Sequence, residues 1–169
     1  WYGINGDIFY GLSTGNGINW VRASNVAGFG NIPKDINAWK FQGDFNGDGL
    51  EDIGFWYGGN GDIYYGLSTG NGINWVLASN VAGFGNAPGN PNRWKFQGDF
   101  NGDGMEDIGL WNGENGEIFY GYSTGNGIDW KLVKNVAGFG NVANNPNRWK
   151  FQGDFNGDGL EDIGFWNGE

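Results

Sequence analysis

Residues 44–52 read Asp-Phe-Asn-Gly-Asp-Gly-Leu-Glu-Asp, and the same stretch returns at 99–107 and 154–162 with Met105 as its single replacement. Oxygen-bearing side chains hold positions 1, 3, 5 and 9, and position 7 offers its backbone carbonyl. Calcium prefers about six to eight oxygens at roughly 2.3–2.6 Å, and a glycine at position 6 permits a sharp turn around an ion. The stretch therefore predicts a calcium-binding loop in each copy.

We expect one Ca²⁺ per repeat and three in all, because every copy keeps every ligand position. The alternative is an acidic, glycine-rich surface turn, since Asn-Gly and Asp-Gly are common in hairpins. The loop closes on Asp at position 9 and lacks the Glu at position 12 that an EF-hand uses. The predicted calcium ligands are Asp44, Asn46, Asp48, Leu50, Asp52, Asp99, Asn101, Asp103, Met105, Asp107, Asp154, Asn156, Asp158, Leu160 and Asp162.

The motif Asp-x-Asn-x-Asp-Gly-x-x-Asp, followed by Ile-Gly-Phe-Trp at 53–56, resembles the calcium-binding FG-GAP or VCBS type of β-propeller repeat. Such repeats occur in integrin alpha subunits, in secreted bacterial proteins, and in fungal propeller lectins related to the Psathyrella velutina lectin. The resemblance covers all three repeats and implies propeller blades that bind calcium. It implies little about function, because this fold serves adhesion, sugar binding and structural roles.

The repeat has a period of 55 residues without an insertion, and successive copies begin at Trp1, Trp56, Trp111 and Trp166. We expect one domain over 1–169, with repeats at 1–55, 56–110 and 111–165 and the start of a fourth copy at 166–169. A period near 50 favours propeller blades over helical solenoids.

Each copy contains four short stretches with the pattern of β-strands. In the second copy they are 53–57, 62–67, 73–81 and 93–99, and the Asn-Gly pair at 60–61 predicts a tight turn between the first two. The predicted fold is therefore all-β, with blades of four antiparallel strands. The loop at 85–92 varies most between copies, which predicts an exposed connection with loose structural demands.

Three repeat lengths are too few for an ordinary propeller, which closes with about four to eight blades. The chain starts and stops between the second and third strands of a blade. Terminal strands could then combine into a composite blade, two chains could join in a six-blade ring, or the chain could be a segment of a longer array. We expect self-association or a longer array rather than a closed three-blade monomer.

The composition excludes several kinds of chemistry. There are no Cys and no His, which removes disulfides, cysteine nucleophiles and Ser-His-Asp triads. Asp7, Asp62 and Glu117 could suggest a glycosidase, but that reaction needs two carboxyls in different environments. A feature copied nearly identically three times does not supply this asymmetry, so we expect a protein that is not an enzyme.

The formal charge of −10 comes largely from the acidic loops, which hold 12 of the 19 Asp and Glu residues. An acidic surface of this kind predicts no nucleic-acid partner. No apolar run is long enough to span a membrane, so no membrane insertion is expected. Because calcium loops of modest affinity fill at the calcium levels found outside cells, we expect a secreted or cell-surface protein.

Aromatic residues are the candidates for ligand contact, because their faces suit the C–H surfaces of sugar rings. The alternative is that they pack between blades. The predicted sugar-stacking residues are Trp20, Trp75 and Trp130, beside Tyr10, Tyr65 and Tyr120. We expect a multivalent, lectin-like protein whose partners are glycans, or alternatively a structural or adhesive module that contacts a cell-surface or matrix partner without binding sugar.

Overall fold

The computed structural model describes residues 5–168, and within them the chain forms twelve β-strands and four short 3₁₀ helices. Residues 1–4 and 169, which belong to the first and fourth predicted copies, lie outside the described residues. The elements are β1 (Asp7–Ser13), β2 (Ile18–Asn25), η1 (Ala27–Phe29), η2 (Ile32–Lys34), β3 (Ala38–Gly43), β4 (Asp52–Tyr57), β5 (Asp62–Ser68), β6 (Ile73–Asn80), η3 (Ala82–Phe84), β7 (Arg93–Gly98), β8 (Asp107–Asn112), β9 (Glu117–Ser123), β10 (Ile128–Asn135), η4 (Ala137–Phe139), β11 (Arg148–Gly153) and β12 (Asp162–Asn167).

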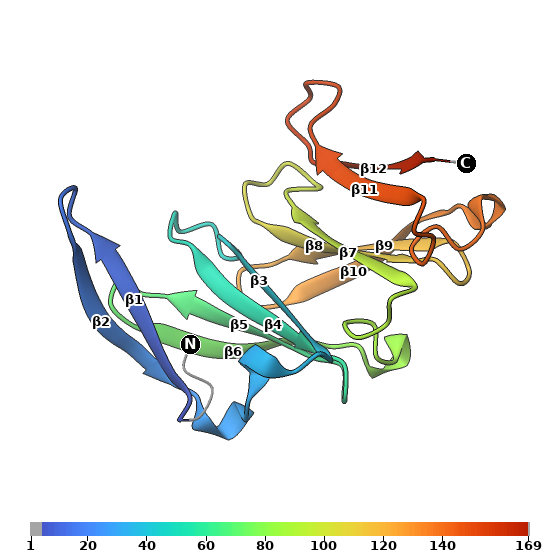
Figure 1. Cartoon of the computed structure of the whole chain (residues 1–169). Helices are drawn as coiled ribbons and strands as arrows, with labels where there is room; N and C mark the ends of the chain where they lie inside the picture. The colour runs from blue at the N-terminus through green and yellow to red at the C-terminus, as the bar shows by residue number, and fades with distance from the viewer. Residues whose placement is uncertain (1–4, 169) are drawn as a thin grey trace.

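The strands form four antiparallel sheets that follow one another along an open arc (Figure 1). The two central sheets have four strands each, in the orders β3-β4-β5-β6 and β7-β8-β9-β10. The outer sheets have two strands each: β1 with β2, and β11 with β12. This confirms the all-β fold with four-stranded antiparallel sheets, and the predicted strands of the second copy match β4 to β7 within one residue at each end.

A tight turn joins β4 to β5, as the Asn-Gly pair predicts. Gly61 has a φ of 84°, which L side chains rarely adopt. A Cβ atom at this position would overlap the backbone of Ala82, and the Gly61 carbonyl accepts a hydrogen bond from the Val81 amide at 2.9 Å. Glycine is thus needed here both for its φ and for the close approach of the chain after β6.

Aromatic side chains fill the space between adjacent sheets. Phe45 stacks on Tyr65 at 4.5 Å with 14° between the rings, and Phe100 stacks on Tyr120 in the same way one repeat later. Trp56 is fully buried in this core. Burial of such large apolar groups accounts for the high aromatic content of a small chain.

The variable connection at 85–92 and its equivalents lead into β7, β3 and β11. It is not simply an exposed loop, so the prediction of an exposed connection with loose structural demands is wrong in part. Its third residue is apolar in every copy and buried in each: Ile32, Ala87 and Val142. This apolar side chain differs in size between copies, but in each copy it packs into the core. Variation in sequence here reflects local repacking rather than freedom from the core.

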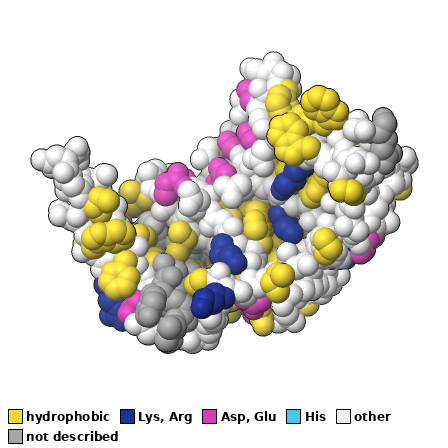
Figure 2. Space-filling view, in the orientation of Figure 1, with side chains coloured by type: hydrophobic (Ala, Val, Ile, Leu, Met, Phe, Trp, Pro, Cys, Tyr) yellow, Lys and Arg dark blue, Asp and Glu magenta, His cyan; other side chains and the backbone are white. Residues whose placement is uncertain are grey.

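Polar contacts also join neighbouring sheets. The Glu106 amide donates to the carbonyl of Asp44 at 2.8 Å, and the Gln97 side chain donates to the carbonyl of Gln42 at 2.8 Å. Figure 2 shows Lys and Arg side chains across the middle of the face in view and several acidic side chains along its upper edge. Among residues 5–168, no helix is long and apolar enough to span a membrane.

Candidate functional site

Two equivalent pockets lie between consecutive repeats. The Phe29 pocket is formed by the segment 28–32 of the first repeat together with β4 and β5 of the next. The Phe84 pocket is formed by residues 83–84 together with β7, β8 and β9, one repeat further along. Seven of the eight residues that line the Phe84 pocket lie 55 positions after residues that line the Phe29 pocket. The pockets therefore repeat with the sequence.

Aromatic rings form the wall of the Phe29 pocket. Phe29 lies 4.8 Å from Tyr64 and 5.1 Å from Phe55, between ring centroids. Phe55 is almost fully buried, whereas Phe29 and Tyr64 are partly exposed. Their accessible faces provide an apolar surface that a pyranose ring could cover.

Carboxylate and amide groups stand beside this aromatic wall. The Asp62 carboxylate accepts hydrogen bonds from the Asn60 side chain and the Asn80 side chain, each at 2.6 Å. Burial, and then the charge of Asp62, raise the pKa of Tyr64. A carboxylate held in place by two amides retains lone pairs that can accept from sugar hydroxyl groups.

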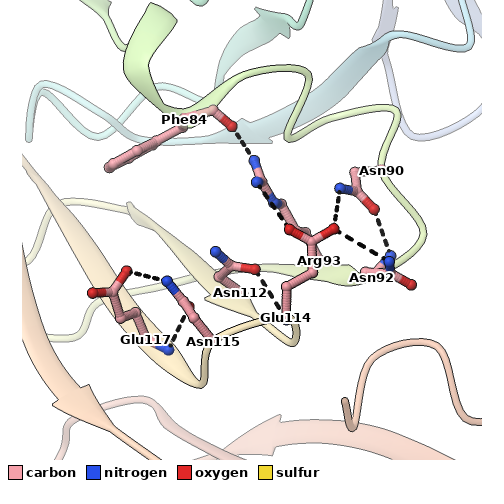
Figure 3. Close-up of polar contacts among 8 residues, drawn as sticks. All are labelled: Phe84, Asn90, Asn92, Arg93, Asn112, Glu114, Asn115 and Glu117. Atoms are coloured by element: carbon pink, nitrogen blue, oxygen red, sulfur yellow. Dashed lines mark hydrogen bonds and ion pairs between the residues drawn. The ribbon is translucent and has the colours of Figure 1, made fainter. Parts of the chain in front are cut away.

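The Phe84 pocket differs because Arg93, one of its lining residues, forms an ion pair with Glu114 (Figure 3). The Arg93 guanidinium donates to the carbonyl of Phe84 and lies 3.5 Å from the Glu114 carboxylate. Hydrogen bonds from Asn90 and Asn92 lower the pKa of Glu114, and the nearby Arg93 lowers it further. The equivalent positions of the Phe29 pocket carry Ala38 and Gly59, so that pocket lacks this pair.

The Glu117 carboxylate of the Phe84 pocket is held by an Asn side chain two residues earlier, as Asp62 is in the Phe29 pocket. The Asn115 side chain donates to the Glu117 carboxylate at 2.6 Å, and the Glu117 amide donates back to Asn115 at 3.0 Å (Figure 3). Two buried polar atoms in this region, Arg93 Nε and Asn92 Oδ1, have no hydrogen-bond partner within residues 5–168. Buried polar atoms without a partner are costly, and a ligand or water could satisfy them.

The acidic loops hold their own backbone in a tight turn. Both oxygens of the Asp44 carboxylate accept backbone amides, including those of Gly47 and Gly49 at 2.7 Å. The Asp48 carboxylate accepts the Leu50 amide at 2.8 Å. The other two loops repeat these bonds, so the three loops have the same conformation.

The last carboxylate of the loop is buried in the two central sheets. Asp52 accepts the amides of Phe45 at 3.1 Å and Ser68 at 2.7 Å. Burial raises the pKa of Asp107, its equivalent, to about 7, and the charges of Asp103 and Asp99 add to this effect. A cation near these carboxylates would offset both effects.

An all-oxygen donor set of this kind fits a hard cation such as calcium. Among the described residues, however, no group of three or more acidic side chains is arranged as a metal site. The Asn46 side chain donates to the Asp48 carboxylate at 3.0 Å, so these two predicted ligands already lie side by side. Asp44, Asn46, Asp48, Asp52 and the backbone of Leu50 would then hold the ion, with their equivalents in the other two loops.

The acidic loops and the pockets lie at opposite ends of the strands. The acidic loop at 44–52 leads directly into β4, whereas the Phe29 pocket includes Tyr57 at the other end of this strand and Asn60 in the turn after it. Six residues of strand span roughly 20 Å. One small ligand therefore cannot contact both sites.

The predicted sugar-stacking residues lie between the sheets. Tyr65 is fully buried and Tyr10 and Tyr120 are partly buried. Trp75 and Trp130 are partly buried, and their indole N–H groups donate to Ser24 and Ser79 of the preceding repeat at 3.3 Å. Trp20 alone of the six is strongly exposed, at 69%. The structure thus places two of the three Trp residues where the packing alternative puts them, and Tyr65 has no exposed face.

Sequence reasoning missed the residues that line the two pockets. Phe29 and Phe84 stand in a Gly-Phe-Gly triplet that is repeated in every copy, and this was the available signal. The first two residues of the triplet belong to a 3₁₀ turn that presents the ring to the next repeat, which the 55-residue period alone does not reveal.

Comparisons with known proteins show a structural relative. A solved structure of an Agrocybe aegerita lectin, described for its specific recognition of non-reducing terminal N-acetylglucosamine, matches with a TM-score of 0.72 and 22% sequence identity. The match covers 94% of this chain and 40% of that one, so the chain spans about two fifths of the length of the lectin. No protein-family model and no curated protein sequence matches the chain. At this identity the likeness shows the fold.

Proposed function

We propose that the chain is a carbohydrate-binding, lectin-like module that uses the pockets between its repeats and catalyses no reaction. The observation that carries this proposal is the pair of equivalent pockets, each with a partly exposed aromatic wall beside an Asn-anchored carboxylate. Shallow aromatic surfaces with a few fixed acceptors suit sugar rings. The fold shared with a lectin that recognises terminal N-acetylglucosamine supports this ligand class.

Calcium is part of the proposal as a structural ion. The acidic loops lie at the far ends of the strands from the pockets, so an ion there would fix the connection between two strands rather than touch sugar. Binding to the folded state alone would stabilise it by mass action. Such loops suit a secreted or cell-surface protein, where calcium is abundant.

The second candidate is a structural or adhesive module that does not bind sugar. The observation in its favour is that Trp56, Trp75, Trp111 and Trp130 all contribute to packing. Under this view the aromatic residues build the surface of a larger assembly, and the pockets are shallow seams between repeats.

A glycan array separates the two candidates. The protein is applied in millimolar calcium, and a parallel array carries chelator. The paired change Asp62→Ala and Glu117→Ala removes the anchored carboxylate from both pockets and should abolish binding to the array. Asp129→Ala is the matched control, because Asp129 is exposed, forms an ion pair with Lys131 and lines neither pocket. A blank array from folded protein favours the structural candidate.

A further inference from the structure

We propose that the Phe29 pocket selects an amino sugar whose amine is free and protonated over the same sugar with an acetylated amine, a preference that rests on the proposed function of this pocket. Three features of the described residues carry the proposal. Two carboxylates line the pocket, no basic side chain lines it, and partly exposed aromatic rings stand in the same wall. The Phe84 pocket lacks this combination.

Two acidic residues line the Phe29 pocket: Asp35, which follows η2, and Asp62, which begins β5. Neither carboxylate forms an ion pair within residues 5–168. The Asp62 carboxylate is held by the neutral side chains of Asn60 and Asn80, and Asp35 Oδ1 accepts the backbone amide of Asn37 at 2.8 Å. Neutral donors orient a carboxylate without cancelling its charge, so the pocket presents two negative charges to a ligand.

The basic side chains around the Phe29 pocket leave these charges in place. The Lys40 ammonium donates to the backbone carbonyl of Asp35 at 3.3 Å rather than to its carboxylate. Lys34 adjoins Asp35 in the sequence but is exposed, where water and salt screen its charge. A cationic group that enters the pocket would therefore be attracted by both carboxylates.

The first repeat shows how the chain uses the same acidic position when a basic side chain is within reach. Asp7 is the equivalent of Asp62, and its carboxylate lies 2.5 Å from the guanidinium of Arg22. The second repeat has Leu77 where the first has Arg22. Asp62 thus keeps its amide partners but has no arginine beside it, and the charge that Arg22 offsets in the first repeat is available to a ligand in the second.

Aromatic faces in the Phe29 pocket add to the attraction for a cation. Phe29, Tyr57 and Tyr64 line the pocket and are partly exposed, and the rings of Phe29 and Tyr64 lie 4.8 Å apart. The face of an aromatic ring attracts an ammonium group within about 6 Å of its centroid. A sugar with a free amine can satisfy both parts of the pocket, because its C–H face covers a ring and its ammonium group meets a carboxylate.

The Phe84 pocket has a different balance of charge and aromatic surface. Its lining includes one basic residue, Arg93, and one acidic residue, Glu117, so their charges cancel. Asn112 stands where the Phe29 pocket has Tyr57, which removes one ring. An ammonium group in this pocket would approach a guanidinium, and like charges disfavour each other. We expect N-acetylglucosamine to bind both pockets and the ammonium form of glucosamine to prefer the Phe29 pocket.

The test is a ¹H–¹⁵N NMR titration of the calcium-loaded protein with glucosamine and, separately, with N-acetylglucosamine. A solution at about pH 6 keeps the amine protonated. The amides of Asp62 and Tyr64 report on the Phe29 pocket, and those of Glu117 and Phe119 report on the Phe84 pocket. Glucosamine should bind the Phe29 pocket about tenfold more tightly than N-acetylglucosamine does, the order expected for an ammonium on an aromatic face in a partly dehydrated site. The Phe84 pocket should show no such preference.

One substitution removes a carboxylate from the Phe29 pocket with little disturbance to the turn. Asp35→Asn introduces the residue that the next repeat has at Asn90, whose side chain accepts the Asn92 amide at 2.8 Å. Asp35 accepts the Asn37 amide at the same distance, so the turn should persist in the variant. Asp35→Asn should remove most of the preference for glucosamine while N-acetylglucosamine still binds.

The control removes the same charge elsewhere. Asp129→Asn changes an exposed residue that lines neither pocket, and it should leave the preference for glucosamine intact. Added salt gives a second comparison, because it screens the attraction between the ammonium group and the carboxylates. Higher ionic strength should weaken the binding of glucosamine to the Phe29 pocket and leave the binding of N-acetylglucosamine unchanged.

The outcomes separate this preference from the proposed function. Saturable binding of both sugars with equal affinity at the Phe29 pocket would overturn the preference and leave the proposed function standing, as would an unchanged preference in Asp35→Asn. An equal preference for glucosamine at both pockets would overturn its assignment to the Phe29 pocket. No saturable shift with either sugar would contradict the proposed function, and the preference would fall with it.

Discussion

The hydroxyl of Tyr65 in β5 lies 3.0 Å from the hydroxyl of Ser123 in β9, and this hydrogen bond joins two neighbouring sheets. Ser123 donates its own proton to the carbonyl of Glu106 at 2.6 Å, so Tyr65 is the donor in this bond. The bond lies in the core, beside the stacked ring of Phe45. Through Ser123, the bond connects Tyr65 to the carbonyl of Glu106, which lies in the loop before β8.

Replacing this tyrosine with phenylalanine tests the coupling. Tyr65→Phe should lower the free energy of unfolding by about 1 kcal/mol, because the ring still packs but Ser123 loses a donor. Urea denaturation measures the change. Tyr122→Phe is the control, since the Tyr122 hydroxyl makes no hydrogen bond within residues 5–168, and it should cost close to nothing. Equal losses in the two variants would contradict the assigned role of the bond.

Two glycines separate the cost of backbone conformation from the cost of close packing. Gly61 and Gly70 have φ values of 84° and 85°, but only at Gly61 would a Cβ atom meet other atoms. Gly70→Ala should cost about 1–2 kcal/mol for the φ value alone. Gly61→Ala should cost clearly more, because the backbone of Ala82 must also move. Thermal unfolding of both variants measures the difference, and equal melting temperatures would show that the packing at Gly61 is loose.

Calcium should stabilise the protein through the acidic loops. At a free calcium concentration about 100 times its dissociation constant, one site would add about 2.7 kcal/mol to the free energy of unfolding. Melting in calcium and in excess chelator measures the effect. The triple change Asp48→Asn, Asp103→Asn and Asp158→Asn removes one charge from each loop and should abolish most of the shift. An unchanged melting temperature in chelator would rule out the structural ion.

The ion pair in the Phe84 pocket should weaken binding there. Arg93→Ala gives this position the residue that the first repeat has at Ala38, and it removes the guanidinium from the space beside Phe84. Sugar affinity at this pocket should rise toward that of the Phe29 pocket. Calorimetric titration of the variant and the parent measures the change. A lower affinity would show instead that Arg93 contacts the ligand.

Much of the fold follows from the sequence, because a 55-residue period with alternating strands and Asn-Gly turns determines the structure within each repeat. Contacts between repeats are harder to predict. Tyr65 is buried because Phe45, in the loop before β4, stacks on it. Phe29 reaches Tyr64 across 35 residues because a 3₁₀ turn redirects the chain. Neither contact leaves a periodic signal of its own.

The acidic loops were the clearest prediction of a site, because liganding chemistry is visible in residue types. The pockets were not predicted, since they form where one repeat meets the next. The same limit applied to the variable connection: Ile32, Ala87 and Val142 vary in size, yet each is buried. A single apolar residue at the same place in each polar loop is the sequence signal that could have revealed this burial.

The most direct test of carbohydrate binding is a ¹H–¹⁵N NMR titration of the calcium-loaded protein with N-acetylglucosamine. Saturable shifts should appear at the amides of Asp62 and Tyr64 and at their equivalents Glu117 and Phe119, while the acidic-loop amides such as Gly49 should stay unchanged. This pattern would locate the ligand in the pockets between repeats. Shifts confined to other residues, or none at saturating sugar, would contradict the account.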